Sequence, residues 1–301
     1  MAKHAYLIMA HDQLPLLRIL LTCLDHEDND IYIHMDKRAS CDFSGLKTAV
    51  KKSGCWFTPR IRVSWGGYSQ IEAELILLQA AVERGGYAYY HLITGADLPL
   101  CSQDRIHAFF DSCGGKEFIS CNANVSPDFA DRLRYYYPFQ EYFPRGSLPG
   151  RILRGGLLRL QKLLRVNRLK RLSAPLGVGS AYFDITETMA RYVLSQTGFI
   201  RKHFRHTLCC DELFLQTVYL SSPYADQGLR YQSTQPEHPF IKPTYLDVLR
   251  AIDWTRGNPY TYTDEDYEML MASGCLFARK FRYDTAPELV HRIAEQATKT
   301  L

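Results

Sequence analysis

The chain has 301 residues, of which 46% are hydrophobic, so it can form one large α/β domain or two small ones around a substantial core. Its formal net charge of +4 is too small to indicate nucleic-acid binding by itself and would suit an anionic ligand equally well. No stretch reaches the roughly 18 uninterrupted apolar residues of a membrane-spanning helix.

The cysteines indicate a reducing compartment. They are odd in number and form neither a CxxC pair nor a spacing typical of zinc ligands. We therefore expect buried, reduced thiols in a cytosolic protein. They lie at positions 23, 41, 55, 101, 113, 121, 209, 210 and 275.

Short β-rich runs alternate with helical patterns along the first hundred residues. We expect strands at 5–10, 30–35, 61–65 and 87–94, and helices at 13–25, 41–50 and 69–84. This alternation predicts an α/β fold with a mainly parallel, twisted sheet and helices on both faces. In such sheets ligands bind beyond the carboxyl ends of the strands. The residues expected there are His11, Asp36, the loop 65–68 and the stretch 94–97.

The pattern loosens after a short run at 117–121. An aromatic stretch, 132–150, precedes a leucine-rich basic segment, 151–172, and together they suggest an insertion around 125–178 in a single domain that covers 1–301. The basic segment suits a solvated surface helix, an interfacial helix on anionic lipid, or a phosphate-backbone contact. No base-stacking aromatic module accompanies it, so we expect no nucleic acid.

Regular structure returns with a strand at 179–186, a helix at 187–198 and the segment "TLCCDELFLQTVYL", 207–220. Two adjacent acids, Asp211 and Glu212, precede a nearly all-apolar helix in this segment. We expect Asp211 to be the N-cap of that helix. Glu212 either suits the positive end of the helix dipole or serves as a general base that the dipole keeps ionised. A helix at 264–272 and the run 273–281 complete the chain.

Anion binding must depend on side chains, because neither GxGxxG nor GxxxxGK[ST] occurs. Arg279 and Lys280 are adjacent in "FARKF". They form either an ordinary pair at a strand end or a phosphate site, since two unbalanced cations repel each other. Arg256 is a third cation of this kind or a plain surface residue. Trp65, in "WGGY", lies in a simple turn or stacks on a base or sugar.

Eight stretches, in this order, resemble the core-2/I-branching family of β-1,6-N-acetylglucosaminyltransferases and the related peptide O-xylosyltransferases. They are "AYLIMAHDQLPLLRIL", "IYIHMDKRAS", "VSWGGYSQIEAELILL", "YYHLITGADLPL", "GSAYFDIT", "DELFLQTV", "AIDWTRGNP" and "LFARKF". The resemblance implies a GT-A type, Rossmann-like fold, a UDP-sugar donor, inversion at the anomeric carbon, and neither a metal ion nor another cofactor. Two D-x-D patterns, Asp28/Asp30 and Asp264/Asp266, are better explained as turn and cap acids than as metal ligands.

The resemblance also assigns roles to individual residues. Glu212 matches the base that takes the proton of the acceptor hydroxyl. On the donor side Asp36 matches the acid at the uridine, Lys280 a cation on the diphosphate and Arg256 a second such cation. On the acceptor side Arg132 and Arg134 lie near the family's basic acceptor residues, and Trp254 resembles a family tryptophan near the acceptor sugar. The crevice position and the "FARKF" pair, not the resemblance, add His11, Trp65 and Arg279 to the expected donor set and Asp97 to the acceptor set.

These matches predict transfer of GlcNAc, with xylose or another hexose as alternatives, to a hydroxyl of a glycan or lipid-linked glycan. We expect surface polysaccharide or glycolipid synthesis by a bacterial, cytoplasmic form without the anchor, stem and disulfides of animal members. Segment 151–172 would contact the inner face of an anionic membrane. The alternative is a catalytically inactive sugar-nucleotide or glycan-binding protein of the same fold.

Overall fold

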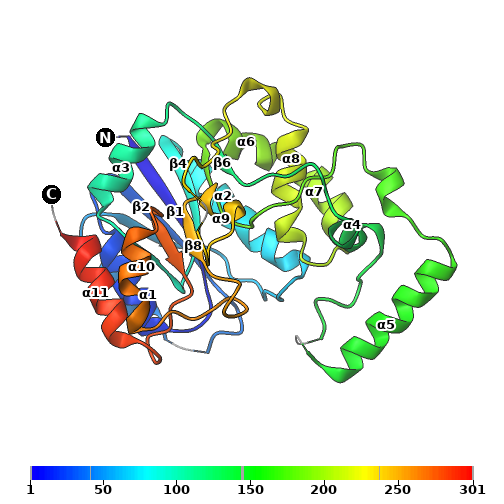
Figure 1. The fold of residues 1–301 in the computed structure, drawn as a ribbon, viewed down its shortest axis with the longest axis horizontal. Coiled ribbons are helices and arrows are strands. Elements are labelled where there is room, and N and C mark those ends of the chain that lie inside the picture. Colours follow the sequence, from blue (N-terminus) through cyan, green and yellow to red (C-terminus); the bar gives the residue numbers. More distant parts are fainter. Residues whose placement is uncertain (1, 41, 144–145, 237, 300–301) are drawn as a thin grey trace.

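A mainly parallel sheet forms the centre of the computed structural model, which describes residues 2–299 except 41, 144–145 and 237 (Figure 1). Within these residues six strands follow the order β3-β2-β1-β4-β7-β6. They are β1 Lys3–Ala10, β2 Asn29–Met35, β3 Gly54–Phe57, β4 Tyr87–Thr94, β6 Phe118–Ile119 and β7 Phe183–Thr186. The pairs among β1 to β4 are parallel, and β7 is antiparallel to β4 and β6. The expected α/β, Rossmann-like class is therefore confirmed.

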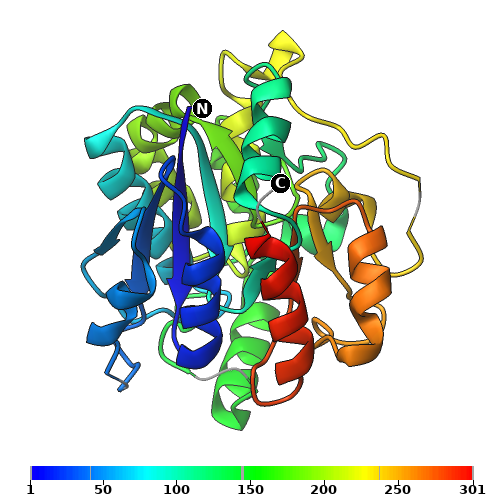
Figure 2. The same ribbon diagram turned by 90° about the vertical axis from the view of Figure 1, so that its left-hand side faces the viewer.

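The alternation of side chains along β1 explains why helices cover both faces of the sheet. Tyr6 and Ile8 belong to one apolar core, and Ala5 and Leu7 to the other, because successive side chains of a strand point to opposite faces. Figure 2 looks onto the first core, where α1 and α11 lie in front of the sheet. The helices of the first face are α1 Leu14–Leu24, α3 Gln103–Ser112, α10 Tyr267–Ala272 and α11 Pro287–Thr298. Those of the second are α2 Tyr68–Arg84, α6 Glu187–Ser195, α7 Thr197–Phe204 and α8 Phe214–Leu220.

Several expected elements differ in the structure, and the helix expected at 187–198 is divided into α6 and α7. Instead of a strand at 61–65, the edge strand is β3, Gly54–Phe57. The backbone of 61–65 turns to groups at the end of β2: the Ile61 N–H donates to His34 Nε2 at 3.1 Å, and the Val63 N–H to Asp36 Oδ2 at 3.2 Å. The helix expected at 41–50 is the shorter 3₁₀ turn η1, Ser44–Ala49. The side chains of His34 and Asp36 thus accept the hydrogen bonds that a neighbouring strand would otherwise accept from this segment.

A small second sheet joins the main one through buried charge. It has the order β5-β9-β8, with β5 Asp97–Pro99, β8 Arg250–Ile252 and β9 Phe277–Arg279. Arg250, on β8, makes two hydrogen bonds to the Asp184 carboxylate on β7, at 2.6 and 2.8 Å. Asp184 also pairs with His91 of β4 at 2.7 Å, so one carboxylate links both sheets. The short α9, Pro243–Leu246, contacts β8, and the turn η5, Asp264–Asp266, precedes α10; the turn η4, Ala225–Gln227, follows α8 on the second core.

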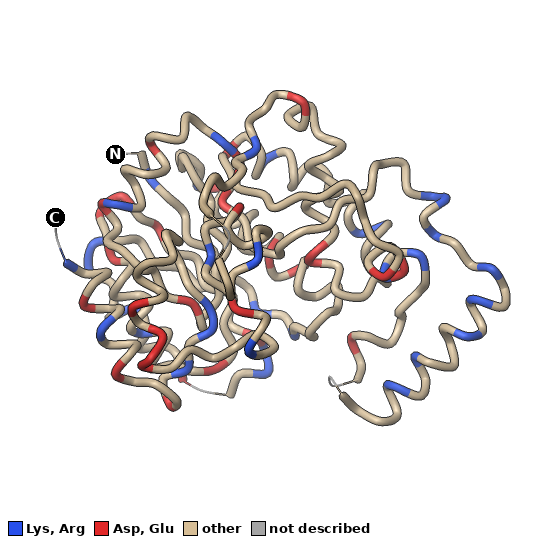
Figure 3. Tube along the Cα trace, in the orientation of Figure 1, with Lys and Arg blue, Asp and Glu red and all other residues tan. Residues whose placement is uncertain are grey.

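The insertion between β6 and β7 holds α4 Pro127–Arg134, α5 Leu148–Leu163 and the turn η2 Arg168–Arg171. α5 projects from the rest of the chain, and Figure 3 shows Lys and Arg but no Asp or Glu along it. Within the described part of the chain no helix is long and apolar enough to cross a membrane. The eight described cysteines are free thiols, and Cys41 lies outside the described residues. The single-domain boundary 1–301 stays a prediction.

Candidate active site

A cleft of ≈ 470 Å³ lies at the carboxyl ends of β1, β2 and β4. It brings together His11, Asp36, Trp65, Arg279 and Lys280, which the sequence placed on the donor side. The predicted crevice position is thus correct for His11, Asp36 and Trp65, and Arg279 and Lys280 line the same cleft. Other lining residues are Met9, Ala10, Asp12, Gln13, His34, Arg38, Val63, Ser64, Gln70, Thr94, Gly95, Ala96, Glu141, Tyr142, Phe143, Phe281 and Arg282.

Asp36 follows directly on β2 and its carboxylate is held by two neighbours. Oδ2 accepts from Arg38 Nη2 at 2.9 Å and from the Val63 N–H, and Oδ1 accepts from the Arg38 N–H at 2.7 Å. Arg60 supports the same loop by donating to the main-chain oxygens of residues 35, 36 and 39. Beside them His34 is buried, and loss of hydration lowers its pKa, which favours the neutral ring that accepts from Ile61. The Asp36 carboxylate is therefore fixed before any ligand arrives.

The two cations of "FARKF" have different surroundings. The Arg279 guanidinium donates to Asp97 Oδ1 at 2.9 Å and also contacts the Thr94 hydroxyl. Burial lowers the pKa of Arg279, but Tyr182 and Asp97 raise it overall, so the group stays charged. Asp97 is 2% exposed and also accepts from the Thr94 N–H. Asp97 thus balances and orients Arg279, which differs from the acceptor contact expected from the sequence. Lys280 lines the cleft itself.

Glu212 lies beside Arg132, which comes from α4. Arg132 Nη1 donates to Glu212 Oε2 at 2.5 Å, and the Glu212 side chain is 29% exposed. No described residue engages Oε1, so one oxygen of this carboxylate can meet a hydroxyl. Arg132, expected at the acceptor, therefore has Glu212, the expected base, as its immediate partner.

The expected capping role of Asp211 is wrong. α8 begins at Phe214, and Asp211 and Glu212 form the preceding 3₁₀ turn η3, Cys210–Glu212. Because Asp211 lies within this turn and not at the cap of α8, its side chain points inward, where Oδ2 accepts from Gln70 Nε2 at 3.1 Å. Glu212 consequently lies before the first turn of α8, and Arg132 supplies the positive charge that the helix dipole was expected to supply.

Asp211 is one of two buried carboxyls below Glu212. Burial, and next the charge of Glu212, raise the pKa of Asp211 to about 7. Burial, and next Asp211, raise the pKa of Glu74 on α2 well above its usual value. Gln70 also lines the cleft, so a single side chain connects the cleft wall to the residue adjacent to Glu212.

Trp254, which the sequence placed on the acceptor side, packs against a tyrosine ring. Tyr245 stacks on Trp254 with ring centroids 6.4 Å apart. Burial, and next the negative charge of Glu212, raise the pKa of the Tyr245 phenol, and Arg279 lowers it. Trp254 is thus packed against Tyr245, and it is not among the described residues that line the donor cleft.

Arg134 and Arg256 are engaged by carboxylates nearby. Arg134 pairs with Asp131 at 2.7 Å within α4. Arg256 donates to Asp253 at 2.5 Å and to Asp266 at 2.7 Å, and it is not among the residues that line the cleft. The structure does not bring Arg256 into the donor cleft with Lys280, because two carboxylates beyond β8 neutralise it where it stands.

Sequence reasoning missed several residues of the site. Arg38 and Arg282 follow Asp36 and Lys280 by two positions, so the same motifs could have identified them. Gln70 and Tyr245 carry no local pattern that indicates a site. Glu141 accepts from the N–H and hydroxyl of residue 69 at 2.9 and 2.7 Å and ties the insertion to α2, a contact made only in the fold.

The fold and the cleft define a Rossmann-like α/β protein with a ligand site at the carboxyl edge of its parallel strands. A family model described as Core-2/I-Branching enzyme matches residues 4–270. The chain belongs to the Core-2/I-Branching enzyme family.

Curated relatives agree with this placement. Xylosyltransferase 2 of Canis lupus familiaris is 25% identical over 95% of this chain and 32% of its own length. Xylosyltransferase 1 of Homo sapiens is 22% identical over 92% of this chain and 28% of its own length. The chain thus spans about a third of the length of these relatives. Among solved structures, one described as a glucose-1-phosphate thymidylyltransferase from Bacillus anthracis has a TM-score of 0.35 and 12% identity, over 75% of this chain and 84% of that one.

Proposed function

We propose that the protein is an inverting, metal-independent glycosyltransferase that moves a sugar from a UDP-sugar to a hydroxyl of a glycan. Family membership supports glycosyl transfer in general. The observation that carries the site assignment is the link from the cleft through Gln70 and Asp211 to Glu212. Glu212 itself is not among the described residues that line the cleft; Gln70 lines it and donates to Asp211, the neighbour of Glu212 in the chain, and this contact supports the assignment.

Glu212 is the general base of this mechanism. Its Oε1 accepts the proton of the acceptor hydroxyl while that oxygen attacks the anomeric carbon from the face opposite UDP. Arg132 holds Oε2 and so orients the carboxylate. A positioned general base typically accelerates a reaction by about 10²–10⁴-fold.

The cations of the cleft stabilise the departing UDP. Arg279, Lys280 and Arg282 line the cleft, and Asp97 fixes Arg279. Cations held in place before the reaction stabilise the charge that develops on a leaving diphosphate. In this scheme they take the role that a metal ion has in other sugar-nucleotide enzymes. Trp65, 50% exposed at the cleft, offers a ring face to the uracil or the sugar.

GlcNAc is the first candidate for the sugar, because the order of motifs resembles the β-1,6-N-acetylglucosaminyltransferases. Xylose is the second, because the curated relatives are named xylosyltransferases. The acceptor is a glycan or lipid-linked glycan of surface polysaccharide or glycolipid synthesis, handled in the cytoplasm.

Release of UDP from a panel of UDP-sugars, with and without excess EDTA, tests this proposal. We expect one donor to be hydrolysed slowly without an acceptor, at the same rate in EDTA. UDP-sugar binding without any turnover, in the presence of an acceptor panel, would identify a catalytically inactive sugar-nucleotide or glycan-binding protein instead. Loss of turnover in EDTA that Mn²⁺ restores would overturn the metal-free mechanism.

A further inference from the structure

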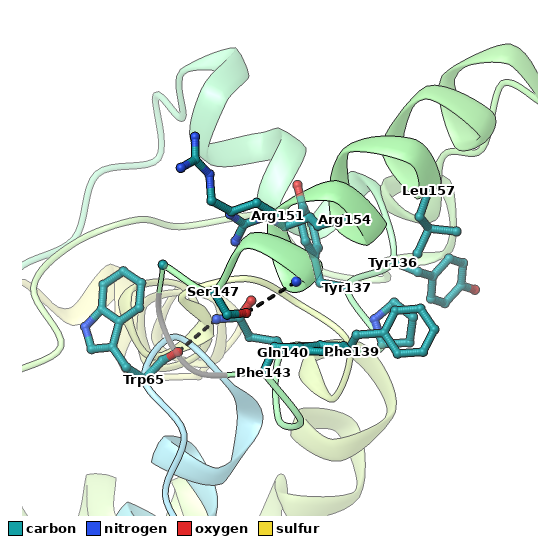
Figure 4. A pocket seen from close by; sticks show the side chains of 13 residues that line it. Trp65, Tyr136, Tyr137, Phe139, Gln140, Phe143, Ser147, Arg151, Arg154 and Leu157 are labelled. Atoms are coloured by element: carbon teal, nitrogen blue, oxygen red, sulfur yellow. Dashed lines mark hydrogen bonds between the residues drawn. The ribbon is translucent and has the colours of Figure 1, made fainter.

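A second hollow adjoins the donor cleft, under the first turns of α5. This aromatic pocket has a volume of ≈ 330 Å³. It is lined by Trp65, Tyr136, Tyr137, Pro138, Phe139, Gln140, Phe143, Gly146, Ser147, Gly150, Arg151, Arg154 and Leu157. Figure 4 shows Trp65 at one end and Leu157 and Tyr136 at the other, with Arg151 and Arg154 on the helix.

The wall of the pocket is fixed by hydrogen bonds. Gln161, the buried residue of α5, accepts from the Tyr136 N–H at 2.7 Å and donates to the Tyr136 carbonyl at 3.0 Å. At the other end Gln140 donates to the Trp65 carbonyl at 2.9 Å. The helix, the loop 136–143 and the rim of the donor cleft therefore form one supported surface.

Trp65 and Phe143 line both the aromatic pocket and the donor cleft. A ligand in the pocket would consequently lie next to one in the cleft. An acceptor requires such a place, because its hydroxyl must approach the bound donor.

The charged side chains of the described residues that line the pocket are all basic. Arg151 and Arg154 are among the lining residues, and none of the described lining residues is acidic. Among the described residues neither guanidinium has a carboxylate partner. Guanidinium groups bind phosphate and carboxylate in a planar, bidentate geometry, and aromatic faces stack on sugar rings.

We propose that the aromatic pocket is the acceptor subsite, and that it selects a glycan with an anionic group, either phosphate or carboxylate. The rings would hold the sugar, and Arg151 and Arg154 the anion. This inference rests on the proposed glycosyl transfer, and it adds a substrate class that the transfer itself does not specify.

Acceptor kinetics test the pocket. Glucose 1-phosphate and glucuronic acid are compared with neutral methyl glucoside, and UDP release is measured with the donor that the panel identifies. We expect a lower KM for at least one charged sugar, and the two charged probes distinguish phosphate from carboxylate. Arg154→Gln should raise that KM roughly tenfold and leave the KM of methyl glucoside unchanged. Arg105→Gln, which removes an exposed arginine on α3, is the matched control.

The proposal of a subsite for anionic sugars would be overturned by equal KM values for charged and neutral sugars. It would also be overturned if Arg105→Gln raised the KM of the charged sugar as much as Arg154→Gln does. Donor hydrolysis by the unaltered protein without an acceptor tests the proposed function separately. Hydrolysis without a preference for charge contradicts the subsite alone, whereas neither hydrolysis nor transfer with any donor contradicts the function.

The outer side of α5 carries a second inference from a different observation. Large apolar side chains there are strongly exposed, from 41% for Leu153 to 79% for Leu163, and the others are Leu148, Ile152, Leu160 and Leu164. At 100° per residue these positions fall within an arc of about 160°. An apolar helix face of this size with no covering element indicates a contact surface.

Basic side chains lie in and beside this outer face. On the same helical projection Arg159 falls within the arc and Lys162 beside it, both exposed on α5, and Arg165 and Lys170 follow the helix. No acidic residue occurs from 148 to 171. Apolar side chains bordered by cations without a compensating acid are complementary to an anionic lipid surface, which offers acyl chains and negative headgroups together.

We propose that the outer face of α5 binds an anionic bilayer. The full chain is floated with vesicles of phosphatidylcholine, with and without phosphatidylglycerol. We expect binding to the mixed vesicles that falls with added salt, and loss of that binding in Ile152→Gln/Leu163→Gln. Arg159→Gln/Lys162→Gln should weaken binding roughly fivefold for each cation removed. Arg105→Gln should bind like the unaltered protein, and circular dichroism checks that each variant is folded.

Three outcomes would contradict the membrane surface. They are the absence of vesicle binding, equal binding to both kinds of vesicle, and binding unchanged in Ile152→Gln/Leu163→Gln. If the same double variant instead abolishes a dimer seen by light scattering without lipid, the face belongs to a second copy of the chain.

Discussion

Arg132 donates to the carboxylate of Glu212 at 2.5 Å across a separation of 80 residues in the chain. Arg132 comes from the insertion and Glu212 from the turn before α8. The insertion thus supplies a residue that contacts the proposed base directly. Because α8 begins two residues after Glu212 and is short, this ion pair is the local source of positive charge at the carboxylate.

Glu212→Gln should abolish sugar transfer and leave UDP binding within a few-fold of the unaltered protein. The amide keeps the size of the side chain but cannot accept the proton, so a loss of about 10²–10⁴-fold in kcat is expected. Single-turnover kinetics and calorimetric titration with UDP provide the two measurements. Glu268→Gln, which alters an exposed glutamate of α10, is the control. Full activity of the Glu212 variant would refute the assignment.

The raised pKa of Asp211 predicts that the stability of the folded protein depends on pH. Its pKa is about 7 in the folded protein, above the ordinary value of 3.8, so the folded state binds the proton more tightly than the unfolded state. The stability that this proton contributes is fully present below about pH 4 and is lost as pH rises through 7. Asp211→Asn removes this titration. Its Tm relative to the unaltered protein should therefore increase from pH 5 to pH 8.

The difference in Tm between Asp211→Asn and the unaltered protein reports the titration of Asp211 alone. Glu117, whose pKa burial raises to about 7, titrates in both proteins and cancels. Glu74 is coupled to Asp211, so Glu74→Gln is measured as the companion variant. A Tm difference that does not change with pH would show that Asp211 is already ionised at pH 5.

The strand ends were predictable from the sequence because a parallel sheet brings them to one edge. His11 and Asp36 each follow a strand directly, and the cleft contains both. Local patterns did not reveal which charges neutralise one another. Arg279 stood out as a cation, but its partner Asp97 lies 182 residues away in the chain, and the pairing exists only because β5 and β9 are neighbours.

The start of α8 shows the other limit of the sequence. An acid before an apolar run is typical of a helix cap, and Asp211 has that position. Burial beside Gln70 and Glu74 decided otherwise, and none of these contacts has a local signal. Prediction therefore succeeded where topology determines position and failed where tertiary packing determines the direction of a side chain.

Lys280 and Arg279 should respond differently to replacement. Lys280→Met removes a cation that lines the cleft, so it should weaken UDP binding about tenfold or more. Arg279→Met also leaves the buried Asp97 without its ion partner, which costs about 3–5 kcal/mol of folding free energy. Urea unfolding and UDP titration of both variants separate the two effects. Equal destabilisation by both variants would contradict this division of roles.

Arg250→Met should destabilise the protein strongly, because it leaves Asp184 charged and fully buried. Breaking such a pair from one side typically costs about 3–5 kcal/mol. The Asp184→Asn change in the same background should recover part of that loss, because an amide can still bond to His91 without an unpaired charge. The free energy of unfolding in urea is measured for both single variants and the double variant. If Arg250→Met and the double variant are equally unstable, the ion pair is not what holds the small sheet against the large one.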